Sequence, residues 1–169
     1  MSDFGKAFDY MIRNEDFSIS GVVTPEPGGG KARLGINSIA NPKAVTDGFY
    51  EMPLDQALTY AKKFYYDNYW INNQLDVIPF QRVSTKLLDM AVNLGNGGMR
   101  RILQRALGVP ETMKMDEPTI IGLGKADNSL VPVLVDKLTA YYQSIYDKNP
   151  AKYAGVLKGW LGRAKKIPQ

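Results

Sequence analysis

The chain has 169 residues, 44% hydrophobic and 22% charged, with a formal net charge of +4, which predicts one folded domain or one domain with a small appendage. It contains neither cysteine nor histidine. This excludes disulfides, Cys or His nucleophiles, Ser-His-Asp triads and zinc sites built from Cys and His. If the protein is an enzyme, its proton transfers must use Asp, Glu, Lys or Tyr.

The first predicted element is a helix over 3–14. Its apolar residues recur at helical spacing, at Phe4, Phe8, Met11 and Ile12. Glu15 follows at the C-terminal end, where the helix dipole disfavours a carboxylate. A glutamate at such a place is either well solvated or held there for a chemical purpose.

The character of the sequence changes from 17 to 39. The segment 18–23 is short and β-like, and the Pro- and Gly-rich stretch 24–30 is expected to be neither helix nor regular strand. Residues 34–36 return as a second β-like segment. We therefore expect a small irregular β-hairpin or a long loop after the first helix.

The rest of the chain is predicted to be helical. The expected helices cover 42–48, 53–65 running into the aromatic cluster 64–70, 79–94, 100–107, a short segment beginning at 116–119, 130–146 and 151–162. Gly95 to Gly98 are expected to end the fourth of these helices. The predicted fold class is mainly α, a helical bundle with one small β excursion, a β-hairpin or irregular loop, after the first helix.

A helix ending in glutamate, a β-like loop and a helical body together suit a cleft between two lobes. A carboxylic acid partly shielded from water in such a cleft can protonate a leaving oxygen, as glycoside cleavage requires. This chemistry needs no histidine or cysteine. The spacing alone carries little weight, because a single glutamate at a helix end is usually a solvated surface residue.

Several motifs spread over nearly the whole chain strengthen this interpretation. They are NEDF at 14–17, EPGGG at 26–30 with LGI at 34–36, YW at 69–70, LDMAVNLG at 88–95, ILQRALGV at 102–109, and GWLGR at 159–163 after Asn149 and Pro150. In this order they resemble the motifs of glycoside hydrolase family 108, lysozyme-like N-acetylmuramidases that hydrolyse peptidoglycan. Two departures stand out: Asp16 and Phe17 replace two glycines of the family, and Ala32-Arg33 replaces a Thr-Asn pair whose hydroxyl is expected near the catalytic water.

The resemblance implies a role for five residues. Glu15 is the expected general acid, and Glu26 is expected to position water or to stabilise an oxocarbenium-like charge. Arg33 is a candidate ligand for an acetamido or carboxylate group, with an exposed hairpin charge as the alternative. Tyr69 is either a sugar-stacking platform or part of the core. Asn93 either donates a hydrogen bond to substrate or caps its helix.

The resemblance also divides the chain into a lysozyme-like catalytic region, 1–110, and a C-terminal helical peptidoglycan-binding segment, 111–169, packed on the same body. The expected activity is cleavage of the β-1,4 glycosidic bonds of peptidoglycan by a phage endolysin or virion-associated lysin. The alternative, motivated by the two departures, is a catalytically drifted lysozyme-fold protein with a structural or wall-binding role in a phage particle or secretion system.

Partners and location follow from the same arguments. The expected partners are peptidoglycan glycan strands and virion components. We expect no nucleic acid, since no groove-reading motif is found, and no metal, cofactor or transmembrane segment. The start of the sequence has neither the basic nor the apolar region of a signal peptide. We therefore expect synthesis in the cytoplasm and action at the cell wall or periplasm, through a holin or within a virion.

Overall fold

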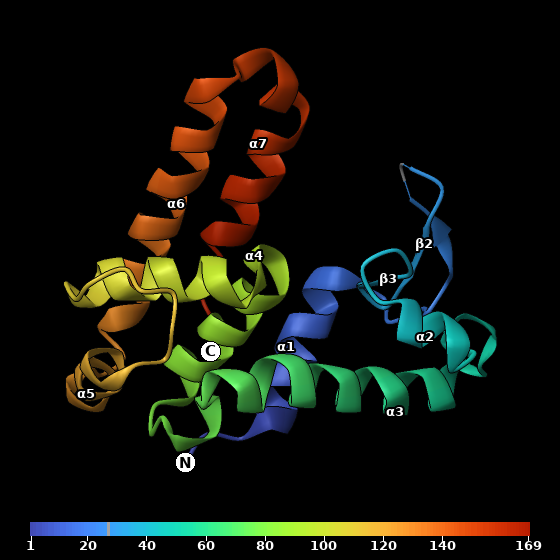
Figure 1. Cartoon of the computed structure of the whole chain (residues 1–169), viewed down its shortest axis with the longest axis horizontal. Coiled ribbons are helices and arrows are strands. Elements are labelled where there is room, and N and C mark those ends of the chain that lie inside the picture. The colour runs from blue at the N-terminus through green and yellow to red at the C-terminus, as the bar shows by residue number, and fades with distance from the viewer. Residues whose placement is uncertain (27) are drawn as a thin grey trace.

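The computed structural model describes residues 1–26 and 28–169, so that Pro27 of the predicted loop motif lies outside the described residues. Within that part there are seven α-helices, and a small antiparallel sheet follows the first of them (Figure 1). The helices are α1 Phe4–Glu15, α2 Pro42–Thr46, α3 Leu54–Tyr65, α4 Gln81–Leu107, α5 Glu117–Lys125, α6 Leu130–Lys148 and α7 Pro150–Ala164. This architecture confirms the predicted fold class.

Helix α1 presents the predicted apolar stripe to the core. Asp3 caps it by accepting a hydrogen bond from the backbone N–H of Lys6 at 3.1 Å. Ala7, Met11 and Ile12 are buried and pack against α4. The helix therefore lies rigidly on the body of the protein, and Glu15 is its last residue.

The sheet has the order β1-β2-β3, with β1 Thr24–Pro25, β2 Lys31–Arg33 and β3 Ile36–Asn37. Leu34 and Gly35 connect β2 to β3 with φ angles of 48° and 77°, as a two-residue primed hairpin turn requires. The predicted strand positions were wrong: of the segment 34–36 only Ile36 lies in a strand, and 18–23 forms no strand whereas Thr24–Pro25 does. Proline is accepted there because β1 is an edge strand, which leaves one side without ladder hydrogen bonds.

An aromatic cluster joins the end of α3 to α1. A π-helical turn, Tyr66–Trp70, continues α3, and Trp70 is buried as expected of a core residue. The rings of Phe4 and Trp70 lie 5.5 Å apart between centroids. This packing fixes α1 against α3.

Helix α4 bends where the sequence predicted a stop. Gly95 has φ 74° and ψ 160°, a conformation that favours glycine, and helical structure resumes after it and runs to Leu107. The two helices predicted at 79–94 and 100–107 are therefore the two arms of α4. Its second arm supports α5, whose N-cap Asp116 accepts from the amide of Thr119 as predicted.

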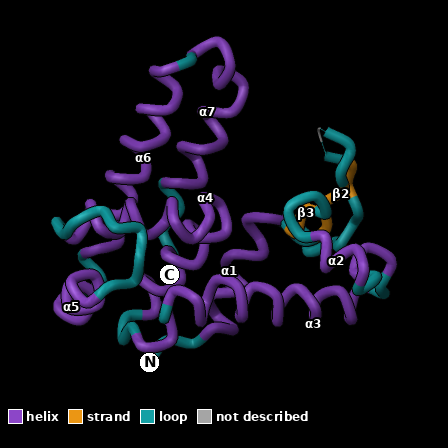
Figure 2. The backbone as a smooth tube through the Cα atoms, in the orientation of Figure 1, coloured by secondary structure: helices purple, strands orange, loops and turns teal. Residues whose placement is uncertain are grey.

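Helices α6 and α7 form a hairpin that packs on α4 through α6 and projects beyond the rest of the body at its far end (Figure 1). Figure 2 shows the strands on one side of α1 and this hairpin on the other. Only the base of α7 returns to the body, where Ala164 is buried. No helix among residues 1–26 and 28–169 is long and apolar enough to cross a membrane.

Candidate active site

A cleft of about 510 Å³ opens between the C-terminal end of α1, the loop that follows it, and the sheet. Glu15, Glu26 and Arg33 all contribute to its lining. Three of the five predicted site residues, from three different segments, therefore lie around one cavity. Tyr69 and Asn93 are not part of this lining.

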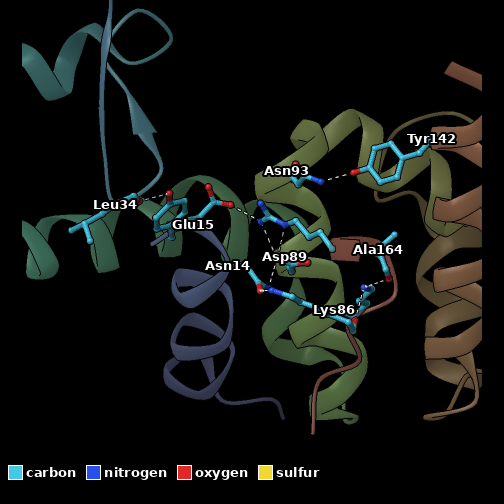
Figure 3. Close-up of polar contacts among 11 residues, drawn as sticks. Asn14, Glu15, Leu34, Lys86, Asp89, Asn93, Tyr142 and Ala164 are labelled. Carbon is cyan, nitrogen blue, oxygen red and sulfur yellow. Dashed lines mark hydrogen bonds and ion pairs between the residues drawn. The ribbon is translucent and has the colours of Figure 1, made fainter. Parts of the chain in front are cut away.

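Glu15 is held at the edge of the cleft, with its side chain 17% exposed. Its Oε1 accepts a hydrogen bond from Nη2 of Arg163 at 2.5 Å (Figure 3). The same Nη2 donates to Oδ1 of Asp89 at 2.9 Å, and Asp89 is only 2% exposed. Burial alone would lower the pKa of Arg163, but the two carboxylates raise it, so that this side chain stays a cation.

The turn between β2 and β3 closes the cleft on the other side of Glu15. The hydroxyl of Tyr65 donates to the carbonyl of Leu34 at 2.9 Å (Figure 3). Burial, and then the charge of Glu15, raise the pKa of Tyr65 well above its ordinary value. Tyr65 therefore remains a neutral donor and fixes the turn beside the Glu15 carboxylate.

Glu26 lies just after β1 and is partly exposed. Its backbone N–H donates to the carbonyl of Gly30 at 2.8 Å, which closes the connection from β1 to β2. Among the residues that the structure describes, its carboxylate has no hydrogen-bond or ion-pair partner. The position leaves that carboxylate accessible to water.

Asp16, the second acidic residue of the NEDF motif, folds the loop after α1. Its Oδ2 accepts from the backbone N–H of Gly21 at 2.8 Å and from Oγ of Ser20 at 3.1 Å. Burial opposes ionisation, but these bonds hold the pKa of Asp16 below its ordinary value. Asp16 therefore has a structural role, and it explains why the segment 18–23 is a turn rather than a strand.

Arg33 is 6% exposed and its guanidinium is used inside the protein. Nε donates to the carbonyl of Gly21 at 2.7 Å, and Nη1 donates to the carbonyls of Phe49 at 2.8 Å and Met52 at 2.7 Å. These bonds tie the loop after α1 to the segment before α3. The structure thus gives Arg33 a bracing function, and its predicted contact with a glycan stays a prediction.

Residues 20–95 match the family model described as glycosyl hydrolase 108. This stretch, a little under half of the chain, is similar to glycosyl hydrolase 108. The match includes Glu26 and Arg33 and begins after Glu15, so the assignment of Glu15 depends on the motif at 14–17 and on the geometry.

The fold is similar to that of a solved structure, SagA from Brucella abortus, with a TM-score of 0.69. The two chains share 23% sequence identity, and the similarity covers 95% of this chain and 88% of that chain. At this identity the likeness establishes the fold. A search of curated proteins gave no significant match.

Two of the predicted site residues lie outside the cleft lining. Tyr69 packs against Phe64 and Tyr65, and burial together with the charge of Glu15 raises its pKa. Asn93 donates from Nδ2 to the hydroxyl of Tyr142 on α6. Asn93 lies two residues before the break at Gly95, and its side chain joins the first arm of α4 to α6.

The structure adds two residues that the sequence reasoning missed. Phe17 lines the cleft with a side chain that is 84% exposed, an unusual position for a phenyl ring. Thr24 also lines the cleft and is paired directly across the sheet with Ala32. Directly opposed residues of an antiparallel pair share one face. Thr24 was missed because the sequence pattern predicts no strand at 24–30 and so does not place its side chain on the face of the sheet that lines the cleft.

Proposed function

We propose that this protein is a peptidoglycan hydrolase, an N-acetylmuramidase that cleaves the β-1,4 bonds of the glycan strand. The observation that carries the proposal is that Glu15 and Glu26 line one cleft, most of whose lining lies within the segment 20–95 that matches glycosyl hydrolase 108. Glycoside hydrolysis by most enzymes requires two carboxyl groups on the two sides of the scissile bond. The cleft lining contains two such carboxyl groups, and the exposed ring of Phe17 lines it as well.

In the proposed reaction, Glu15 donates a proton to the glycosidic oxygen as the bond to the anomeric carbon breaks. A water molecule attacks that carbon, and Glu26 positions the water or stabilises the oxocarbenium-like charge. The hydroxyl of the water stays on the anomeric carbon, and the proton that the water loses passes to Glu26 or to solvent. Glu15 then regains a proton from solvent, so that one water is consumed for each bond cleaved. The third carboxylate in the lining, Asp16, is not used because its oxygens hold the loop.

The substrate and the place of action belong to the same proposal. The net charge of +4 favours an anionic wall polymer over a neutral glycan. We propose that the protein is a lysin that acts at the cell wall or periplasm, reaching it through a holin or within a virion. Lysis of cells that express it, only after the inner membrane is permeabilised, would support this route.

A second function deserves a test because of one contact. Arg163 forms an ion pair with one oxygen of Glu15, as it would with a carboxylate that has a purely structural role. The alternative is a catalytically silent protein that binds peptidoglycan or has a structural role in a phage particle or secretion system. The two functions differ in whether new reducing ends form.

The experiment measures reducing ends released from purified peptidoglycan by the wild type, Glu15→Gln and Glu26→Gln. Glu117→Gln, an exposed glutamate on α5 far from the cleft, is the matched control. We expect release by the wild type and the control, almost none by Glu15→Gln, and a reduced rate for Glu26→Gln. Sedimentation with insoluble wall material but no release, by a folded wild type, would favour the silent alternative.

A further inference from the structure

We propose that Arg163 of α7 is a positioning residue for Glu15, and that the C-terminal hairpin thereby completes the active site. The inference rests on the proposed function, because it concerns how the general acid is held. Arg163 lies 148 residues after Glu15, in the last turn of α7. The hairpin thus contributes a charged group directly to the cleft-lining carboxylate.

Arg163 forms ion pairs with two carboxylates, those of Glu15 and Asp89. The Arg163 side chain is 18% exposed, and its Nη2 joins Glu15 of α1 to Asp89 of α4 (Figure 3). Asn14, one residue before Glu15, also donates to Oδ1 of Asp89 at 3.0 Å. Three helices therefore meet at one cation. If the Arg163 guanidinium moved away, the two carboxylates would stay partly buried without their ion-pair partner, which is unfavourable.

The end of α7 is fixed independently of this ion pair. Lys86 is 0% exposed, and its Nζ donates to the carbonyls of Ala164 at 2.7 Å and Lys166 at 2.8 Å. Lys86 lies one helical turn before Asp89 on α4, on the same face. Lys166 in turn donates to Oδ1 of Asn14 at 2.8 Å. The backbone that carries Arg163 is thus held on both α4 and α1.

The geometry distinguishes the two oxygens of Glu15. Oε1 accepts from Arg163, whereas Oε2 lies on the side of Gly35, where an added Cβ would come within 2.9 Å of it. Gly35 is part of the cleft lining. Arg163 therefore fixes one oxygen and directs the other toward the cleft. A glutamate side chain has three rotatable bonds. Holding it in the conformation from which it donates its proton raises kcat of the enzyme–substrate complex and does not change the affinity for substrate.

The consequence is that the segment 111–169 is not merely a binding appendage. A chain truncated after 110 lacks the cation that holds Glu15, whatever its affinity for the wall. The kinetic parameter that changes also distinguishes this role from substrate binding. Loss of a positioning residue lowers kcat and leaves KM nearly unchanged, whereas loss of a binding residue raises KM.

The test compares Arg163→Met and Arg163→Lys with Arg105→Met in the full chain, with soluble glycan strands as substrate. Arg105, on the second arm of α4, forms an ion pair with the exposed Glu111 that follows this helix, and is the matched control. Arg163→Met should lower kcat about 100-fold and leave KM within about twofold of the wild type. Arg163→Lys should recover part of kcat, because a point charge retains one of the two contacts. Arg105→Met should behave as the wild type.

Thermal unfolding of each variant identifies those that are folded at the assay temperature. If Arg163→Met does not fold, the lysine variant decides the question by its own loss of kcat at unchanged KM. A folded variant at position 163 with wild-type kcat, or one whose loss is entirely in KM, would overturn the inference while the proposed function stands. A wild type that releases no reducing ends would overturn the proposed function, and the positioning role with it.

Discussion

Gly35 lies against the carboxylate of Glu15 so closely that a Cβ at Gly35 would stand 2.8 Å from Cγ and 2.9 Å from Oε2 of that glutamate. The same Cβ would come within 2.6 Å of the Tyr65 hydroxyl. Gly35 also has a positive φ of 77°, which disfavours any other residue. The β2–β3 turn and the proposed general acid are thus packed as one unit.

Replacing Gly35 by alanine should therefore affect activity as well as stability. Gly48 has a similar φ of 72° with open space around its Cβ, so Gly48→Ala has the backbone strain without the contact. Gly48→Ala should lose about 1–2 kcal/mol in the free energy of unfolding from backbone strain. Gly35→Ala should lose more, because its Cβ also contacts Tyr65 and Glu15. Only Gly35→Ala should lose most of its glycan cleavage. Equal activities of the two folded variants would contradict the coupling between the turn and Glu15.

Phe17 offers a test of the substrate side of the cleft. Its ring is exposed at the rim, where the flat face of a sugar can stack on it. Phe17→Ala should raise KM for glycan strands several-fold, as expected for the loss of about 1 kcal/mol of aromatic contact, and should hardly change stability. Phe17→Tyr keeps the ring and should retain the wild-type KM. An unchanged KM for the alanine variant would exclude stacking at this position.

Thr24 tests whether a hydroxyl on β1 replaces the one absent at Ala32. The two residues are paired across the sheet, and both line the cleft. Thr24→Val should lower kcat, because the valine keeps the shape and removes the hydroxyl. Adding Ala32→Thr to that variant should restore part of kcat. If Thr24→Val has wild-type kcat, the Thr24 hydroxyl does not assist the water.

Asp16 makes the loop of the cleft sensitive to acid. Its folded pKa lies below the ordinary value of 3.8, so its stabilising bonds are fully present above about pH 4 and are lost as the pH falls through the folded pKa. Asp16→Asn should lower the free energy of unfolding by about 1 kcal/mol at neutral pH and should flatten the acid dependence below pH 4. Unfolding curves at several pH values measure both. An acid dependence identical in variant and wild type would exclude this role.

Much of the fold could be predicted because its signals are local. Helical spacing at Phe8 and Met11, the cap at Asp116 and the break at Asn149 each depend on neighbouring residues, and each is found in the structure. The positions of the strands along the sequence were not predictable in this way. Asp16 draws the following segment into a turn, and that contact is invisible to strand propensity.

The candidate site shows the same division. Glu15 and Glu26 could be proposed from motifs and do share a cleft. The partner of Glu15 could not, since Arg163 is far along the chain and nothing near it in sequence indicates a carboxylate. Arg33 was predicted as an exposed or substrate-facing charge, but three backbone carbonyls bury it. Long-range pairing, rather than local pattern, decides what a charged side chain does.

The most direct test of the proposed activity identifies the chemical nature of the new chain ends. Purified peptidoglycan is treated with wild type or Glu15→Gln, the products are reduced with borohydride, and mass spectrometry determines which sugar was reduced. We predict reduced N-acetylmuramic acid ends with the wild type and none above background with the variant. Equal amounts of such ends from both proteins, or none from a folded wild type at acidic and neutral pH, would contradict the assignment of Glu15 as the general acid of a muramidase.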